Sequence, residues 1–406
     1  MVSTAAQPPV TDLLELSPEF VSNPYPVYEK LRRQAPVHHV RTPDGDDVWL
    51  VVGHEACRAA FTDPRLSREW RRSGRMSQIK STDQDDPNLA HLLMADPPDH
   101  TRLRRLVSRD FTPRRIAALA PRVQQVTDGL LDAMLAGPDR RADLVEAFAF
   151  PLPMTVICEL LGVPELDRDA FRGWSNQAIA PTSGPEQAAA YTELTAYFTR
   201  LIADKRGRPG EDLLSTMIHA VDEGGDRLSP DELIGMCSLL LIAGHETTVN
   251  LISGGMRALF AHPDQAALLR ADLDGLMDGA IEEMLRYDGP VETSTGRLAV
   301  ADVEMGGVLI PSGATVLIVI ADAGRAPERF EDPDRFDIRR DARGHIAFGH
   351  GIHYCLGAPL ARMEGRIALR ALLERCPGLA LDADPATLPW MPGMLMRGVR
   401  KLPVRW

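Results

Sequence analysis

Apolar residues recur at intervals of three and four along most of the chain, which is the spacing of one face of an α-helix. Three such stretches, at residues 121–136, 143–161 and 187–206, predict helices. Prolines and glycines separate the helical stretches, and no internal repeat or low-complexity tract is present. The pattern therefore indicates a mainly α-helical protein.

Two sections carry a β-type pattern instead. Residues 36–41 and 48–52 flank a Pro-Asp-Gly turn at residues 43–46 and predict a β-hairpin. Residues 300–321 are also β-prone, and the run 315–320 within them is apolar enough to be buried on both faces of a sheet. A small β-rich lobe is therefore expected beside the helices.

The chain is expected to form one domain over residues 1–406, because no Gly/Ser-rich or Pro-rich linker divides it. The β-rich lobe lies near residues 36–53 and 292–321. Polar and charged residues dominate residues 67–95, which predicts a long loop. A loop of this length is either a solvated surface excursion or a functional segment.

The longest predicted helix begins at a strong start signal. Ser229 can cap it, proline follows, and Glu232 completes a capping box. With no further proline before Pro263, the helix can extend for about 30 residues, or roughly 45 Å. Residues 236–244 are apolar around nearly the whole circumference, which is typical of a helix that passes through a core.

This buried helix contains an acid and a hydroxyl in the sequence Ala243-Gly-His-Glu246-Thr247. A carboxylate in a core is costly unless it has a partner. One interpretation is structural: Thr247 bonds to the carbonyl of Ala243 and Glu246 pairs with an arginine. The other is a proton path beside a bulky ligand, for which Gly244 leaves space. The helix alone leaves both open.

Composition excludes several classes of protein. The 45 Lys plus Arg against 57 Asp plus Glu give a net charge of −12, so nucleic acid is not an expected partner. Neither a secretory signal nor an apolar run of membrane-spanning length is visible, and a cytoplasmic protein is expected. The scattered cysteines contain no C-x-x-C pair, which argues against a disulfide framework or a Cys₄ zinc site; they are Cys57, Cys158, Cys237, Cys355 and Cys376.

One cysteine lies in a glycine-rich loop at residues 348–357, just before a predicted helix that begins at Ala358. A helix N-terminus favours the thiolate over the thiol. Three interpretations compete for this loop. His350, His353 and Cys355 could bind zinc, although their spacing is compressed; Cys355 could be a nucleophile with a histidine base; or Cys355 could be the axial thiolate ligand of a haem.

Three motifs together resemble those of the cytochrome P-450 monooxygenases. Residues 348–357 (Phe-x-x-Gly-x-His-x-Cys-x-Gly) are similar to the haem-binding signature, and residues 243–247 to the oxygen-activating helix motif. Glu283 and Arg286, three apart on a predicted helix at 274–287, resemble the family's E-x-x-R pair. The motifs occur in the family's order and at its intervals. The resemblance covers nearly the whole chain and is greatest to actinobacterial polyketide hydroxylases, among them macrolide hydroxylases of the pikromycin-pathway type.

The resemblance implies a P-450 fold, with haem b between the long central helix and the cysteine-loop helix. Cys355 is then the axial metal ligand, whose thiolate favours O–O cleavage. Glu246 and Thr247 are implied to be catalytic, delivering protons during oxygen activation. Buried cationic side chains are implied to hold the haem propionates; they are His100, Arg104, Arg297 and His353.

No G-x-G-x-x-G motif follows a predicted strand, so electrons are expected from outside the chain. The resemblance implies that a ferredoxin and its reductase supply them. Residues 99–115 contain six arginines against Asp99 and Asp110, a basic band that can steer an acidic partner. The protein is expected to be a monomer. A haem-thiolate protein that binds a ligand without turnover is the alternative to the monooxygenase.

The substrate is expected to be a hydrophobic small molecule, and the resemblance implies a macrolide or related polyketide that is hydroxylated or epoxidised. It also implies an access loop near 67–95 and these substrate contacts: Asp85, Met94, Ile242, Ala243, Val291 and Met394. Asp85 is where an acid would hold a cationic amino sugar, whereas Met94 stands where similar enzymes carry an acid. A macrolide with an amino sugar and one without it both remain open.

Overall fold

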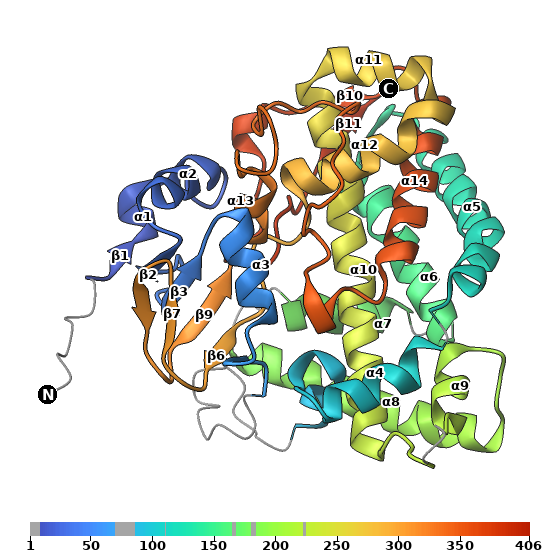
Figure 1. Cartoon of the computed structure of the whole chain (residues 1–406). Coiled ribbons are helices and arrows are strands. Elements are labelled where there is room, and N and C mark those ends of the chain that lie inside the picture. The colour runs from blue at the N-terminus through green and yellow to red at the C-terminus, as the bar shows by residue number, and fades with distance from the viewer. Residues whose placement is uncertain (1–8, 70–85, 110, 165–167, 180–183, 222–224) are drawn as a thin grey trace, which may run out of the picture.

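The computed structural model describes residues 9–69, 86–109, 111–164, 168–179, 184–221 and 225–406. A large helical part and a smaller sheet lobe lie side by side, with helix α10 (Pro230–Ala261) crossing the centre of the helical part (Figure 1). This architecture confirms the prediction of a mainly α protein with a small β-rich lobe.

Helices make up most of the described chain. Besides α10 they are α1 (Leu13–Leu16), α2 (Tyr25–Gln34), α3 (His54–Thr62), α4 (Asp99–Ser108), α5 (Pro113–Leu135), α6 (Pro151–Leu161), α7 (Arg168–Ile179), α8 (Gly184–Gly207), α9 (Leu213–His219), α11 (Pro263–Ala271), α12 (Leu273–Asp288), α13 (Ile320–Gly324) and α14 (Ala358–Arg375). Short 3₁₀ turns include η3 (Pro87–Leu89), η4 (Leu92–Met94), η7 (Gly351–His353) and η8 (Pro385–Thr387), and Val145–Ala149 form a π-helical turn, η5.

The main sheet of the lobe has, within the described residues, the strand order β1-β2-β3-β9-β6-β4. Its strands are β1 (Thr11–Asp12), β2 (Val37–Arg41), β3 (Asp47–Val51), β4 (Leu66–Ser67), β6 (Arg297–Ala299) and β9 (Thr315–Ile318). The predicted hairpin is confirmed as the antiparallel pair β2 and β3, and β9 runs parallel to β3. Smaller sheets join β7 (Val303–Met305) to β8 (Val308–Ile310), and β10 (Ala380–Leu381) to β11 (Pro403–Arg405) and β5 (Arg141–Asp143).

Both faces of the main sheet are covered. Val316 and Ile318 of β9 belong to one buried apolar cluster, together with Trp49 of β3. Leu317, between them, packs against a second cluster that contains Tyr28 of α2. The run 315–320 therefore packs apolar side chains on both sides of the sheet, as its composition predicts.

Helix α10 begins at the predicted residue because its start is encoded locally. The Ser229 hydroxyl accepts from the Glu232 amide, and the Glu232 carboxylate accepts from the Ser229 amide at 2.8 Å, which completes the capping box. Further along, α10 packs closely on α14: a Cβ placed on Gly365 would lie 2.9 Å from the Leu251 side chain. The central helix and the helix after the cysteine loop thus form one packed unit.

Two predicted helix starts differ from the structure. Helix α5 begins at Pro113 rather than residue 121, because Thr112 caps it and Pro121 is accommodated inside the helix. The stretch 143–161 is not continuous: Asp143 ends strand β5, and its carboxylate accepts from the Leu402 amide at 2.9 Å. Pairing with the C-terminal strand therefore replaces the first helical turn.

Among the described residues, no helix combines the length and the apolar character that a membrane crossing requires.

Candidate active site

The cysteine loop is closed by a backbone hydrogen bond from the Cys355 amide to the Phe348 carbonyl, 2.9 Å long. Gly349 and Gly351 adopt φ angles of 75° and 76°, in the left-handed region that favours glycine. A Cβ on Gly351 would also lie 3.1 Å from the Thr62 side chain of α3. The loop holds the Cys355 side chain exposed, just before α14, whereas the other four cysteines are buried thiols.

The expectation that the helix N-terminus makes Cys355 a thiolate is only half met. The backbone amides of Gly357 and Ala358, and the guanidinium of Arg104, do lower the pKa of the thiol. Desolvation by the surrounding protein raises that pKa more strongly, so the net direction is upward. A metal ion bound at the sulfur would favour the thiolate over the thiol.

Near the centre of α10, side chains become accessible in a helix that is otherwise largely buried. Ala243 is exposed and Thr247 is half-buried. The Thr247 hydroxyl donates to the Ala243 carbonyl at 2.9 Å, as the structural interpretation predicts. Because the donor is used within the helix, the hydroxyl oxygen remains able to accept a hydrogen bond from a neighbouring group.

Among the described residues, Glu246 does not pair with an arginine as the structural interpretation expects. Its carboxylate lies 3.6 Å from Nε2 of His245, while a hydrogen bond with Asn250 lowers its pKa slightly. Desolvation outweighs that bond and raises the pKa of Glu246 to about 7. Burial in turn lowers the pKa of His245 to about 4, so the histidine is neutral at pH 7 and supplies no counter-charge. A carboxyl that titrates near neutrality is suited to proton transfer.

The predicted propionate partners His100 and His353 come together although they lie far apart in sequence. Their rings meet edge to face with centroids 4.4 Å apart. Both nitrogens of each ring are buried without a hydrogen-bond partner, and so is Nε of Arg297. Burial and neighbouring cations lower the pKa of His353 to about 2. A cluster of buried, unpartnered donors of this kind fits an anionic group, and the two carboxylates of a haem satisfy that requirement.

Two arginines, Arg104 and Arg68, lie near the paired histidines. Arg104 is half-buried on α4, four residues after His100, and interacts electrostatically with Cys355. Residues His100 and Arg104 therefore share one face of a helix, as their spacing predicts. Arg68, fully buried near the same cluster, was not among the expected site residues. No local sequence signal marks it, because its environment is built from distant segments.

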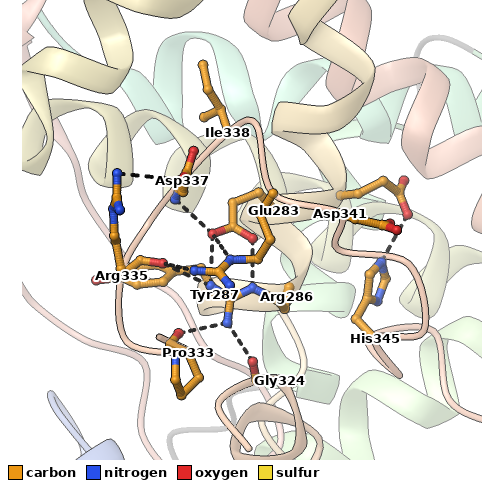
Figure 2. Close-up of polar contacts among 12 residues, drawn as sticks. Glu283, Arg286, Tyr287, Gly324, Pro333, Arg335, Asp337, Ile338, Asp341 and His345 are labelled. Atoms are coloured by element: carbon orange, nitrogen blue, oxygen red, sulfur yellow. Dashed lines mark hydrogen bonds and ion pairs between the residues drawn. The ribbon is translucent and has the colours of Figure 1, made fainter. Parts of the chain in front are cut away.

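The Glu283–Arg286 pair lies in the interior of the protein, and Figure 2 shows its contacts. Two nitrogens of Arg286 donate to the Glu283 carboxylate at 2.7 and 2.8 Å, and both side chains are inaccessible to solvent. The remaining donors of Arg286 bond the carbonyls of Gly324, Pro333 and Arg335. The pair thus fastens α12 to the chain that leads to the cysteine loop.

The expected substrate residues lie in different environments. Ile242 and Val291 are half-buried. Met94 is half-buried and packs with Leu298, and Met394 is buried in the cluster around Tyr28, whereas its neighbour Leu395 is 42% exposed. Asp85 lies outside the described residues.

The zinc interpretation of the cysteine loop is not supported by geometry. Within the part of the chain that the structure describes, which includes His350, His353 and Cys355, no three His, Cys, Asp or Glu side chains are grouped to hold a metal ion. A haem, which needs only the sulfur as protein ligand, fits the loop.

Comparison with known proteins agrees with this arrangement. The sequence profile of the family described as Cytochrome P450 matches residues 198–398. The chain is 57% identical to cytochrome P450 monooxygenase PikC of Streptomyces venezuelae, over 99% of this chain and 96% of PikC. It is 44% identical to 6-deoxyerythronolide B hydroxylase of Saccharopolyspora erythraea, over 94% and 95% of the two chains.

Solved structures show the same fold. The tirandamycin C-bound P450 monooxygenase TamI superimposes with a TM-score of 0.89 at 43% identity, covering 97% of this chain and 99% of TamI. Myxobacterial cytochrome P450 CYP267B1, in complex with myristic acid, gives a TM-score of 0.91 at 40% identity, with 97% and 98% coverage. Sequence, fold and site together establish that the chain belongs to the cytochrome P450 family and is a monooxygenase with a haem iron ligated by a cysteine thiolate.

Proposed function

We propose that this monooxygenase hydroxylates a macrolide or related polyketide, with haem b as its cofactor and a ferredoxin as its electron donor. The observation that carries the oxygenase chemistry is the pairing of an exposed thiol, Cys355, with a central helix whose accessible middle section is bordered by Glu246 and Thr247. The substrate class is supported by the names of PikC and 6-deoxyerythronolide B hydroxylase.

Haem bound to Cys355 supplies the activation of O₂. The protein's part is proton delivery and the exclusion of bulk water. Glu246 takes up a proton at its carboxyl group and releases it at neutral pH, since its pKa is about 7. Thr247 orients the accepting end of this path, because its hydroxyl is fixed by the bond to Ala243.

The propionates are held, in this proposal, by the unpartnered nitrogens of His100, His353 and Arg297, with Arg104 adding positive charge beside Cys355. Without an anion the buried nitrogens of His100, His353 and Arg297 would remain unsatisfied, at a cost of about 1–3 kcal/mol for each side chain.

Ferredoxin docking is supported by the arginines of α4 and α5. Four of the six arginines between residues 99 and 115 are exposed, namely Arg105, Arg109, Arg114 and Arg115. Arg102 pairs with Glu232, and Arg104 interacts electrostatically with Cys355. The exposed four form a basic surface that an acidic electron carrier can recognise.

The substrate chamber is proposed to include Ala243, Ile242 and Val291, whose accessible apolar surfaces suit a hydrophobic ring. Leu395 joins them in preference to the buried Met394. Asp85, outside the described residues, is proposed to contact an amino sugar if the substrate carries one. An Asp85→Asn variant then binds a desosaminyl macrolide more weakly than the native protein, whereas unchanged affinity removes this contact.

Two measurements test the proposal. The reduced carbon-monoxide complex must show the red-shifted Soret band of a haem thiolate; a spectrum without it contradicts the haem assignment. A panel of macrolides and aglycones, titrated by the substrate-induced shift of the ferric spectrum and then assayed for products with ferredoxin and its reductase, tests the substrate class. Binding without any oxidised product would contradict the proposed substrate class.

A further inference from the structure

Arg68 is a cation buried in the interior with one unused donor. It is 2% exposed, directly after strand β4, and its Nη2 atom has no hydrogen-bond partner. The other nitrogens are engaged: Nε donates to the Leu93 carbonyl at 2.9 Å, and Nη1 to the Thr295 carbonyl at 2.8 Å. Two nitrogens of this guanidinium are fixed by hydrogen bonds, and the third is buried without a partner. This third nitrogen can donate to a further hydrogen-bond acceptor.

Two charged side chains of opposite sign, Arg297 and Asp96, act on Arg68. Arg297 disfavours its charged form, and Arg68 in turn is the strongest of the charges that lower the pKa of His353. Among the residues that the structure describes, Asp96 is the anion that acts on Arg68, and its carboxylate accepts from the Ser67 hydroxyl and the Arg68 backbone amide rather than from the guanidinium. Arg68 therefore lies beside the predicted propionate partners Arg297 and His353, and within the described part of the chain its Nη2 atom bonds no carboxylate.

We propose that Arg68 binds a haem propionate through Nη2 and thereby ties the cofactor to the segment that carries Met94. This inference rests on the proposed haem site. It adds to that site a ligand from outside the recognised motifs. It also gives the segment before α4 a direct connection to the cofactor, because the same guanidinium holds the Leu93 carbonyl, one residue before Met94.

The test compares haem retention in full-length holoenzymes. In Arg68→Gln, transfer of ferric haem to excess apomyoglobin should be about tenfold faster or more, as expected for a lost hydrogen bond between charged groups. Arg68→Lys, which keeps the charge but not the fork, should show a smaller increase. Arg325→Gln is the matched control: Arg325 is 7% exposed and also donates to a carbonyl, that of Tyr287, but its ionic partner is Asp334.

The ferric–ferrous reduction potential is a second readout. Removal of a positive charge near the haem disfavours the reduced state, so the potential of Arg68→Gln should fall while that of Arg68→Lys stays closer to the native value. The proposal is overturned if Arg68→Gln loses haem no faster than Arg325→Gln, or if its potential is unchanged.

Haem with esterified propionates separates direct from indirect action. In proteins reconstituted with haem dimethyl ester, the difference in haem loss between native protein and Arg68→Gln should disappear. A difference that persists would show that Arg68 acts only through folding. Failure of the proposed haem site can be distinguished from failure of the Arg68 contact. If the haem site is wrong, the native protein and the variants all lack the haem-thiolate spectrum.

Discussion

The carboxylate of Glu246 lies 3.6 Å from Nε2 of a histidine that cannot neutralise it. His245 is fully buried, and its ring nitrogens are engaged with the Ser175 hydroxyl at 3.0 Å and the Leu241 carbonyl at 2.7 Å. Its pKa near 4 keeps it neutral at working pH. Desolvation by burial therefore raises the pKa of Glu246 to about 7, and the neutral His245 beside it does not offset that rise.

We predict that Glu246→Gln slows product formation by on the order of 10²-fold, since a positioned proton-transfer group contributes that much or more. The native pH–rate profile should show an inflection near the Glu246 pKa of about 7, and the variant should lack it. Steady-state product assays between about pH 5.5 and 8.5, a range of about three units that brackets this pKa, provide the measurement. An inflection retained in the variant would assign it to another group.

The same carboxyl makes stability depend on pH. Its pKa is raised from 4.5 to about 7 in the folded protein, so the folded state binds more protons than the unfolded state between these values. The stability present below pH 4.5 is therefore lost as pH rises through 7. The unfolding temperature of Glu246→Gln, relative to that of the native protein, should increase as pH rises from about 5 to about 8, a range that brackets the titration of Glu246. Parallel curves would contradict this.

Thr247→Ala should uncouple electron use from product formation. The hydroxyl is held by its bond to the Ala243 carbonyl, and its loss removes the ordered end of the proton path. We expect at least about tenfold less product for each NAD(P)H consumed, while NAD(P)H oxidation continues. Thr247→Ser keeps the hydroxyl and is the matched control, which should remain largely coupled. Unchanged coupling in Thr247→Ala would exclude this role.

The contact between α10 and η3 is expected to tolerate no side chain at Gly235. A Cβ there would lie 2.6 Å from the Ala90 carbonyl oxygen, and nearby Asn88 accepts from the Ser238 hydroxyl at 2.5 Å and donates to Thr195 at 2.6 Å. Gly235→Ala should therefore lower the free energy of unfolding by about 1–3 kcal/mol. It should also weaken substrate binding, measured by spectral titration.

Gly129→Ala is the control for that substitution. Gly129 lies in α5, and a Cβ added there would meet nothing within 4 Å, so alanine should be neutral or stabilise by up to about 1 kcal/mol. Equal thermal midpoints for the two alanine variants would contradict the close packing of η3 on α10.

Arg286→Lys should be far more damaging than the same change at the surface. Lysine cannot satisfy the two Glu283 contacts and three carbonyls that Arg286 binds in the interior, so a loss of about 3–5 kcal/mol and poor haem incorporation are expected. Arg122→Lys, in a two-pronged but largely exposed pair with Glu159, should cost less than about 1 kcal/mol. Chemical denaturation and haem content measure both.

Reduction by ferredoxin should depend strongly on salt. The second-order rate constant should fall by about tenfold between low and high ionic strength, and charge reversal at Arg114 and Arg115 should reduce both the rate and its salt dependence. Arg33→Glu, on α2 at the sheet lobe, reverses an exposed charge elsewhere and should leave the rate unchanged. A rate insensitive to salt would place the docking surface elsewhere.

The features that the sequence predicts well are those encoded within a few residues. Helix α10 starts where the sequence predicts because the capping box of Ser229 and Glu232 is local. The hairpin of β2 and β3 follows from its turn residues, and the cysteine loop from its glycines. Each of these signals needs no knowledge of the rest of the fold.

Features that depend on distant partners could not be predicted. Strand β5 exists because β11 pairs with it, which the helical pattern around Asp143 does not show. The buried Arg68 side chain donates hydrogen bonds to carbonyls that lie 25 and 227 residues away along the chain. The orphaned nitrogens of His100 and His353 likewise appear only once α4 and the cysteine loop meet. Such environments arise from tertiary packing.

Glu232 closes the capping box of α10 and also pairs with Arg102 on α4. One side chain therefore has two structural roles: it stabilises the start of α10, and it neutralises Arg102 on α4. Glutamine retains the first function and loses the second, whereas a shorter residue loses both. A change at residue 232 therefore alters the start of α10 and its attachment to α4 together.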